Sequence, residues 1–138
     1  MQLGKDIAAV VTGAASGLGA ATARALAAKG VRVGVLDLNK DGGEKIAKEI
    51  GGTFASCDVT NEASVDAALA AVRKVHGQER ILVNCAGIAI GKRIARRVKE
   101  TNAVEAHDVA TFAKVIAINL VGTFTMMAKS SAGMLDLA

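Results

Sequence analysis

The stretch that decides the fold lies near the N-terminus and reads Ile7-Ala8-Ala9-Val10-Val11-Thr12-Gly13-Ala14-Ala15-Ser16-Gly17-Leu18-Gly19. Its apolar first half predicts a buried parallel strand over residues 7–12. Apolar side chains at helical spacing then predict a helix over Gly17–Lys29, with Gly30 as its C-terminal stop. A glycine-rich turn between a strand and a helix indicates a site for phosphate groups, because the helix N-terminus offers free N–H donors and a positive dipole.

The next part of the chain repeats the same alternation of strand and helix. Further strands are expected at 31–37, 53–58 and 81–85, and further helices at 41–50 and at 60 or 61 to 76. Asp41 and Glu44 are spaced as a capping box at the start of one of these helices. The pattern predicts an α/β fold, a Rossmann-type doubly wound parallel sheet in one domain over residues 1–138, incomplete at the C-terminal side. The predicted strand order is 3-2-1-4.

Composition narrows the class of protein. The chain has 138 residues, a net charge of +4 and 51% hydrophobic residues, which excludes a disordered, solvating tail. We find no stretch that approaches the roughly 20 uncharged apolar residues of a membrane span, and no signal peptide, so a soluble cytoplasmic protein without a membrane partner is expected. Cys57 and Cys85 form no metal-binding pattern, and the strand order places them about 14 Å apart, too far for a disulfide.

The second half of the chain begins with a charged segment. Residues 87–107 are expected to form a long polar loop, and Asp108 to cap a long helix. Five basic residues lie close together in the loop: Lys92, Arg93, Arg96, Arg97 and Lys99. They form either a solvated face or an attractive surface for an acidic substrate, such as the phosphates of a coenzyme A thioester. No aromatic residue lies among them, so nucleic acid is not an expected partner. His76 and His107, at helix ends, are interpreted as surface or capping residues.

The glycine turn carries the functional hypothesis. Gly13 permits the tight turn, Gly17 lets the backbone approach a pyrophosphate, and Gly19 allows close packing of helix and strand. Asp37 ends the second strand, where a carboxylate can accept both hydroxyls of an adenosine ribose and repel a 2′-phosphate. This pattern favours NAD over NADP. The alternatives are a glycine turn that binds nothing and a solvated aspartate at a strand end.

Four motifs together resemble the short-chain dehydrogenase/reductase family. They are the T-G-x-x-x-G-x-G spacing from Thr12 to Gly19, the pair Asp58-Val59, the sequence Asn84-Cys85-Ala86-Gly87, and Asn119 within a late helix. The cysteine departs from the N-N-A-G of the family. The variant N-C-A-G-I-A over residues 84–89, followed by a basic loop and N-L-x-G-T-F from Asn119, narrows the resemblance to the type-2 3-hydroxyacyl-CoA dehydrogenase branch.

The resemblance implies hydride transfer between NAD and a secondary alcohol or ketone, with a 3-hydroxyacyl-CoA as one such substrate, in a homodimer or homotetramer. The residues it assigns to coenzyme binding are Gly13, Ser16, Gly17, Leu18, Gly19, Asp37, Asp58, Val59, Asn84, Cys85, Ala86 and Gly87. It assigns to Asn119 a water-holding role in a catalytic proton relay. Purely structural amides remain the alternative for both Asn84 and Asn119, and Cys85 is interpreted as a small pocket-lining residue. No metal is implied.

One part of the family pattern is missing. Members use a serine and a Tyr-x-x-x-Lys after the next strand, and these 138 residues contain no tyrosine. The sequence stops at Ala138, near the end of the preceding helix, and we do not assign Ser130 or Ser131 to the missing role. The chain alone is therefore expected to be inactive and to leave its fourth strand as a bare apolar edge. Three interpretations remain open: a truncated enzyme sequence, a short non-catalytic dinucleotide-binding module, or a fragment that associates through its last helix.

Overall fold

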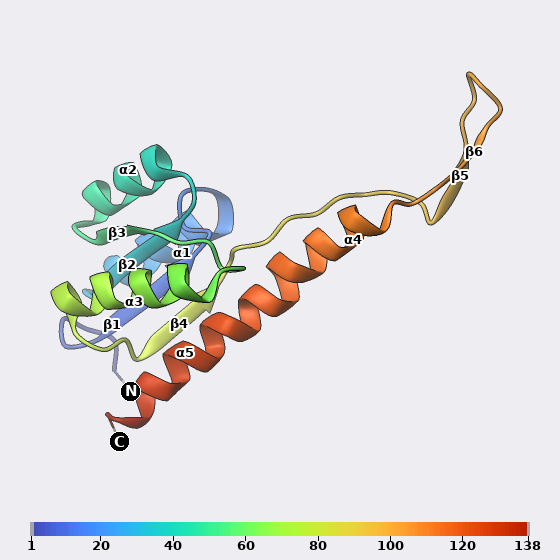
Figure 1. Ribbon diagram of the computed structural model, residues 1–138. Coiled ribbons are helices and arrows are strands. Elements are labelled where there is room, and N and C mark those ends of the chain that lie inside the picture. Colours follow the sequence, from blue (N-terminus) through green and yellow to red (C-terminus); the bar gives the residue numbers. More distant parts are fainter. Residues whose placement is uncertain (1, 138) are drawn as a thin grey trace.

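The computed structural model describes residues 2–137 and contains one four-stranded parallel sheet. Its strands are β1 (Ala8–Thr12), β2 (Arg32–Asp37), β3 (Thr53–Ser56) and β4 (Ile81–Asn84). The helices α1 (Gly17–Ala27), α2 (Lys40–Ile50) and α3 (Glu62–His76) connect them in turn. The observed order β3-β2-β1-β4 confirms the predicted order and the Rossmann-type fold class (Figure 1).

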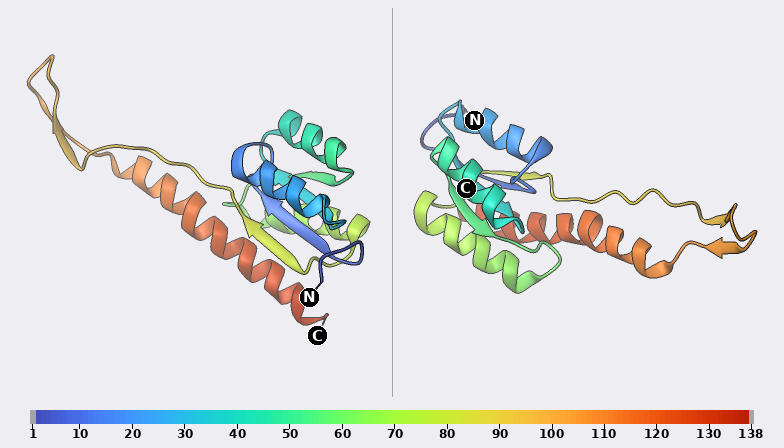
Figure 2. Two further views of the ribbon diagram at one scale, coloured as in Figure 1. Left: turned by 180° about the vertical axis from the view of Figure 1, so that it is seen from behind. Right: turned by 90° about the horizontal axis from the view of Figure 1, so that it is seen from above.

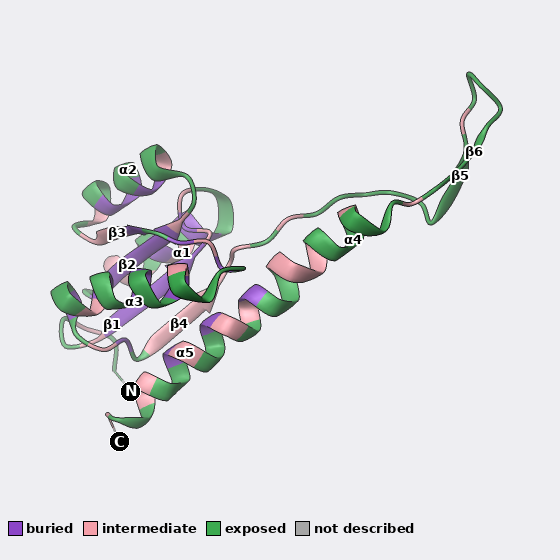
Figure 3. Ribbon diagram, viewed as in Figure 1, coloured by how far each residue is buried: buried purple, intermediate pink, exposed green. Residues whose placement is uncertain are grey.

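The sheet has a core on each face, because successive side chains of a strand point to opposite faces. Val11 of β1 packs in the core that α1 and α2 cover, together with Ala23 and Ile46. Val10 packs in the opposite core, with Leu69 of α3 and Met126 of the last helix. All five residues of β1 are buried, as expected for a strand with a neighbour on each side (Figure 3).

The helices start at side-chain caps, and one of these differs from the prediction. Asn39 caps α2 by accepting a hydrogen bond from the backbone N–H of Gly42 at 3.0 Å. The capping box predicted from Asp41 and Glu44 is therefore wrong, and α2 begins at Lys40. Asn61 caps α3 in the same way, through the N–H of Ser64. An Asn cap is as favourable as an Asp cap, and the sequence offered both within three residues.

The expected loop over residues 87–107 contains a β-hairpin. Strands β5 (Ala95–Arg97) and β6 (Val104–Ala106) pair antiparallel, and all six of their residues are exposed. The turn between them uses Asn102 in the left-handed region at φ 55°, which asparagine tolerates better than most residues. Both views in Figure 2 show this hairpin projecting away from the sheet on a long extended segment. We refer to residues 88–108 as the arm.

The last part of the chain is one continuous helical rod. It consists of α4 (Val109–Ile116), a π-helical turn η1 (Ala117–Gly122) and α5 (Thr123–Leu135). The side chain of Asp108 caps it through the N–H of Thr111, as predicted, whereas the π turn was not predicted. By length and composition, Val109–Leu135 could cross a membrane, so the expectation that no segment reaches that size and polarity is wrong. In the structure, α5 packs on α3 and β4.

A buried ion pair holds α5 against the sheet. Glu79, between α3 and β4, is fully buried and accepts two hydrogen bonds from Arg73, at 2.7 and 2.9 Å. Its Oε1 also accepts a hydrogen bond from the hydroxyl of Ser130 on α5, at 2.7 Å. Nearby, His76 is buried with its Nε2 unpartnered among the described residues, so its predicted surface position is wrong. Because α5 covers part of it, β4 is half-buried along its whole length rather than bare.

Candidate functional site

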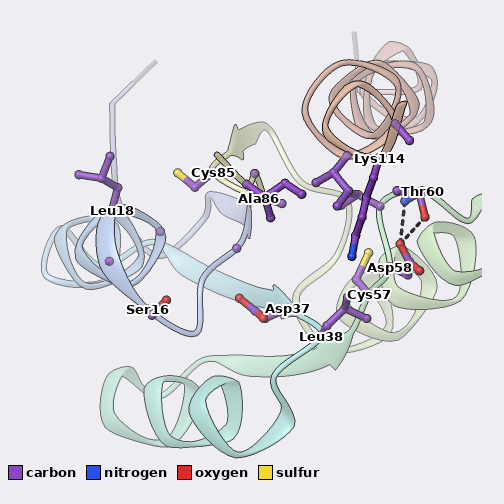
Figure 4. Close-up of a pocket in the computed structure, with 18 residues that line it drawn as sticks. Ser16, Leu18, Asp37, Leu38, Cys57, Asp58, Thr60, Cys85, Ala86 and Lys114 are labelled. Atoms are coloured by element: carbon purple, nitrogen blue, oxygen red, sulfur yellow. Dashed lines mark hydrogen bonds between the residues drawn. The ribbon is translucent and has the colours of Figure 1, made fainter. Parts of the chain in front are cut away.

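A pocket of about 680 Å³ lies at the carboxyl ends of the strands, within the usual size range of small-molecule sites. It is lined by the glycine loop, by the ends of β2, β3 and β4, and by one face of the rod around Lys114 (Figure 4). Every residue predicted to bind coenzyme lines this pocket except Asn84. Segments that are far apart in sequence therefore converge on one crevice, the place where doubly wound sheets bind ligands.

The three glycines of the loop meet different steric requirements. Gly13 has φ +62°, and a Cβ there would lie 2.7 Å from the backbone nitrogen of Ala86, beyond the end of β4. A Cβ on Gly19 would overlap the carbonyl oxygen of Gly13, so the first turn of α1 rests directly on the loop. Gly17 also has positive φ, at +52°, but the space beside it is open. The loop is therefore tightly packed at Gly13 and Gly19 and open at Gly17, and all three glycines line the pocket.

Asp37 is both a structural and a site residue. Its Oδ2 accepts a hydrogen bond from the N–H of Ala15 at 3.0 Å, and its Oδ1 accepts one from the N–H of Asn39 at 2.9 Å. The first bond joins the glycine loop to the end of β2. An ionised carboxylate has about four lone-pair sites, so both oxygens keep capacity for further donors. Asp37 is half-buried and lines the pocket.

The pair Asp58-Val59 lies beyond β3, on the far side of Asp37 from the loop. Oδ1 of Asp58 accepts hydrogen bonds from both the hydroxyl and the N–H of Thr60, at 2.7 and 2.9 Å, and these bonds lower the pKa of the carboxyl below its ordinary value. Its Oδ2 has no hydrogen-bond partner within residues 2–137. Val59 is buried, and its side chain contacts the position of Gly122 in the π turn. A carboxylate oxygen thus remains available at this end of the pocket.

Thr12 has a role that the sequence interpretation missed. Its buried hydroxyl oxygen accepts hydrogen bonds from the N–H groups of both Cys85 and Ala86, each at 3.1 Å. These bonds join the end of β1 to Cys85 and Ala86 after β4, two residues that line the pocket. Asn84, in contrast, is half-buried and has its Oδ1 unpartnered among the described residues. The threonine before the first glycine was a visible signal, but no role was assigned to it.

Asn119 forms a clamp on the backbone. Its Oδ1 accepts a hydrogen bond from the N–H of Ile88 at 2.9 Å, and its Nδ2 donates one to the carbonyl oxygen of the same residue at 2.8 Å. The side chain lies beside Gly87, where a Cβ would come within 3.3 Å of the amide oxygen. Asn119 is exposed and lies within the π turn. Its contacts fix the start of the arm against the rod.

The two cysteines differ in their surroundings. Cys57 is buried, and desolvation together with the nearby carboxylates of Asp58 and Asp37 raises the pKa of its thiol to about 11. The thiol is therefore protonated at neutral pH and a poor nucleophile. Cys85 is half-buried at the end of β4. Both are free thiols that line the pocket.

The basic cluster lies on the arm, away from this pocket (Figure 2). Part of its charge is neutralised locally, because Arg96 pairs with Glu105 and Lys92 with Asp108, each at 2.9 Å. The hydrogen bonds from Thr111 and the Lys92 ion pair hold the pKa of Asp108 well below its usual range. Arg93 and Lys99 make no ion pair with any described residue and line a second hollow on the arm.

Comparison with known proteins agrees with this geometry. The family model for short chain dehydrogenases matches residues 7–137. The chain belongs to the short-chain dehydrogenase family. It is 42% identical over 125 residues to 3-hydroxyacyl-CoA dehydrogenase type-2 of Bos taurus, covering 89% of this chain and 46% of that protein. It is 43% identical over 123 residues to D-threitol dehydrogenase of Mycolicibacterium smegmatis, and the match covers 86% of this chain and 44% of that protein.

A solved structure of the protein gox2181 superposes with a TM-score of 0.81 at 31% identity, covering 95% of this chain and 49% of that one. The chain thus spans about half the length of the dehydrogenases it matches. The family match includes the rod, so this apolar helix is part of the short-chain dehydrogenase domain. The pocket is also lined by Leu38, Thr60 and Lys114, which the sequence interpretation did not select. Lys114 lies on the rod, and no local motif connected it to the site.

Proposed function

We propose that this chain is the coenzyme-binding part of an NAD-dependent oxidoreductase that transfers hydride between NAD and a secondary alcohol or ketone. Bound NAD supplies the hydride acceptor, and NADH the donor. The supporting observation is the pocket that joins the open side of Gly17 to the carboxylate of Asp37. These residues fit an adenosine diphosphate group, with bare backbone for the phosphates and an acid for the sugar.

Each residue of the chain has a defined task in this proposal. The loop and the N-terminus of α1 bind the diphosphate through backbone N–H groups. Asp37 accepts the ribose hydroxyls and, because no Lys or Arg lies within the loop, repels a 2′-phosphate. Ala86 and Gly87 border the opposite end of the pocket, where the nicotinamide would lie. Asn119 positions that backbone through Ile88.

The substrate class that we propose is a 3-hydroxyacyl-CoA or its 3-keto product. The relatives named 3-hydroxyacyl-CoA dehydrogenase type-2 support it, together with the exposed cations of the arm. Proton transfer to or from the substrate oxygen requires a group that these 138 residues do not supply, since they contain no tyrosine. We therefore propose that the chain alone binds coenzyme without turnover.

The test of this function is a coenzyme titration. We expect the chain to bind NADH at least tenfold more tightly than NADPH, because one acid against a phosphate costs about 1.4 kcal/mol or more. Asp37→Asn keeps an acceptor for the N–H of Ala15 but removes the negative charge. It should therefore weaken NADH binding and reduce the difference in affinity between NADH and NADPH.

Asp41→Asn is the matched control, because Asp41 is exposed on α2 and lies outside the pocket. It should leave both affinities unchanged. Equal affinity of the unaltered chain for NADH and NADPH would disprove the role of Asp37, and no binding of either would disprove the proposed function.

A further inference from the structure

The arm and α4 form a surface that the described part of the chain leaves uncovered. Figure 1 shows the arm projecting past the sheet, with α4 at its base, and no residue of α4 is buried. All six residues of the hairpin strands are exposed as well. The other half of the rod differs, because α5 packs on α3 and β4 and buries Met126 and Ser130. We refer to residues 88–116 as the outer surface.

Large apolar side chains on the outer surface face solvent. On the arm, Ile94 is 89% exposed and Val104 is 66% exposed. On α4, Val109 and Phe112 are 79% and 59% exposed, and their spacing of three residues places them on one side of the helix. Removing these side chains from water would be favourable in proportion to the apolar area that is covered. The outer surface is therefore suited to contact with an apolar medium.

The outer surface also carries cations without partners. Two of the five cations on the arm are neutralised by the ion pairs described above. The other three, Arg93, Arg97 and Lys99, form no ion pair with any residue of 2–137. In the hairpin, Arg97 lies directly opposite Val104, so a free cation and an exposed apolar side chain share one face. Exposed cations among apolar side chains are typical of segments that lie at the surface of an anionic bilayer.

A second copy of the chain would fit the outer surface less well than such a bilayer. Each copy has a net charge of +4 and the same free cations on its arm, so two copies repel each other at long range. An anionic lipid surface instead attracts the cations and accepts the apolar side chains at its interface. By length and composition, Val109–Leu135 could cross a membrane. Because α5 is packed on α3 and β4, however, a shallow contact through α4 and the arm keeps the fold intact.

We propose that the outer surface is a docking site for an anionic lipid bilayer, with Val109 and Phe112 at the interface and the free cations of the arm against lipid phosphates. The chain lies on the bilayer and does not cross it. This inference departs from the expectation of a protein without a membrane partner. It does not depend on coenzyme binding, so either proposal can fail without the other.

Cosedimentation with lipid vesicles tests the apolar part of the inference. We expect the full chain to bind vesicles of equal parts phosphatidylcholine and phosphatidylglycerol at low salt, and vesicles of phosphatidylcholine alone at least about tenfold more weakly. Phe112→Ser should weaken binding to the anionic vesicles about tenfold, the scale of burying one large apolar side chain. Phe124→Ser is the matched control and should change nothing, because Phe124 is 67% exposed but lies on α5, outside the outer surface.

Charge is tested by the double substitution Arg93→Gln with Lys99→Gln. It should weaken binding to the anionic vesicles about 20-fold, because each cation near such a surface contributes roughly a factor of five. Lys29→Gln with Lys74→Gln removes the same charge from exposed positions outside the outer surface. This control should weaken binding no more than about twofold, since distant charges are screened by salt.

Four outcomes would overturn the inference. Two are the absence of binding to anionic vesicles and equal binding to both vesicle compositions. The third is an equal loss in Phe112→Ser and Phe124→Ser, which would assign the contact to the whole rod. The fourth is a dimer in sedimentation velocity without lipid that Phe112→Ser abolishes while vesicle binding is unchanged, which would assign the surface to a second copy. Each variant should keep the unfolding midpoint of the unaltered chain by circular dichroism, so that a loss of binding is not due to misfolding.

Discussion

The sheet with its three helices and the arm are stabilised by different forces. In the first region β1 is buried throughout, and two apolar cores fix every strand. In the arm both strands are fully exposed, and the contacts are short hydrogen bonds and exposed ion pairs. An isolated two-stranded hairpin is marginally stable in water, and exposed ion pairs contribute little. The comparison teaches that short-range turns and ion pairs determine the structure of the arm, whereas close apolar packing determines the structure of the sheet and its helices.

Glycine substitutions should separate the two regions most strongly. In Gly13→Ala the new Cβ would collide with the backbone of Cys85 and Ala86, at a residue already in the left-handed region. We expect loss of measurable NADH binding and a lowered unfolding midpoint by circular dichroism. Gly91→Ala is the control in the arm, where nothing lies within 4 Å. A Gly13→Ala chain that binds NADH normally would show that the loop tolerates rearrangement.

Charge removal should give the next largest contrast. Glu79→Gln leaves Arg73 without its buried ionised partner, and we expect the free energy of unfolding to fall by about 2 kcal/mol in urea titrations. Glu105→Gln removes the carboxylate of the exposed Arg96 pair on the arm and should leave the unfolding midpoint unchanged. Equal effects of the two substitutions would contradict the view that burial decides which ion pair matters.

The same pair predicts an acid sensitivity. Burial alone would raise the pKa of Glu79, but the hydrogen bonds from Arg73 and Ser130 outweigh it and lower the pKa below its ordinary value. A carboxyl whose pKa is lower in the folded state adds stability above its unfolded pKa of about 4.3. That stability is lost as the pH falls through the folded value. The difference in stability between the unaltered chain and Glu79→Gln should therefore shrink below about pH 4.

Sequence periodicity was informative where burial determines structure. The four sheet strands and the helices between them follow apolar runs and glycine stops, so their order and approximate bounds were predictable. The hairpin was not, because its strands are three residues long and carry exposed charges, so no alternating apolar face marks them. The cap of α2 was misassigned because Asn39 and Asp41 are both good caps, and only tertiary context selects between them.

In the pocket, too, residues with a local sequence signal were predictable, whereas residues placed there by tertiary packing were not. The glycine loop and Asp37 were predictable because they are close in sequence and each has a local reason for its residue type. Lys114 reaches the pocket from a helix that begins after the arm, and only the packing of the rod places it there. The contact between the buried Glu79 and Ser130 was missed for a similar reason, since the two residues are 51 positions apart in the sequence. Contacts between distant elements carry no signal in a single sequence.

The smallest expected effect concerns the cations of the arm. Arg93 and Lys99 lack ion-pair partners among residues 2–137, so their charge is available to an anion, whereas Arg96 is already neutralised by Glu105. The double substitution Arg93→Gln and Lys99→Gln should weaken binding of coenzyme A about threefold at low salt, because exposed charges act through screened attraction. NADH binding, in the other pocket, should not change.

Lys29→Gln with Lys74→Gln removes the same charge from exposed positions on the sheet-bearing region and is the matched control. If both double variants lose the same affinity for coenzyme A, the effect is due to net charge and the arm has no specific role. If neither loses affinity, the cluster is a solvated face. If only the arm variant loses affinity for coenzyme A, the exposed arm contributes to ligand binding through its charge. This is physically reasonable because a charged group, unlike an apolar core, attracts a ligand without being buried.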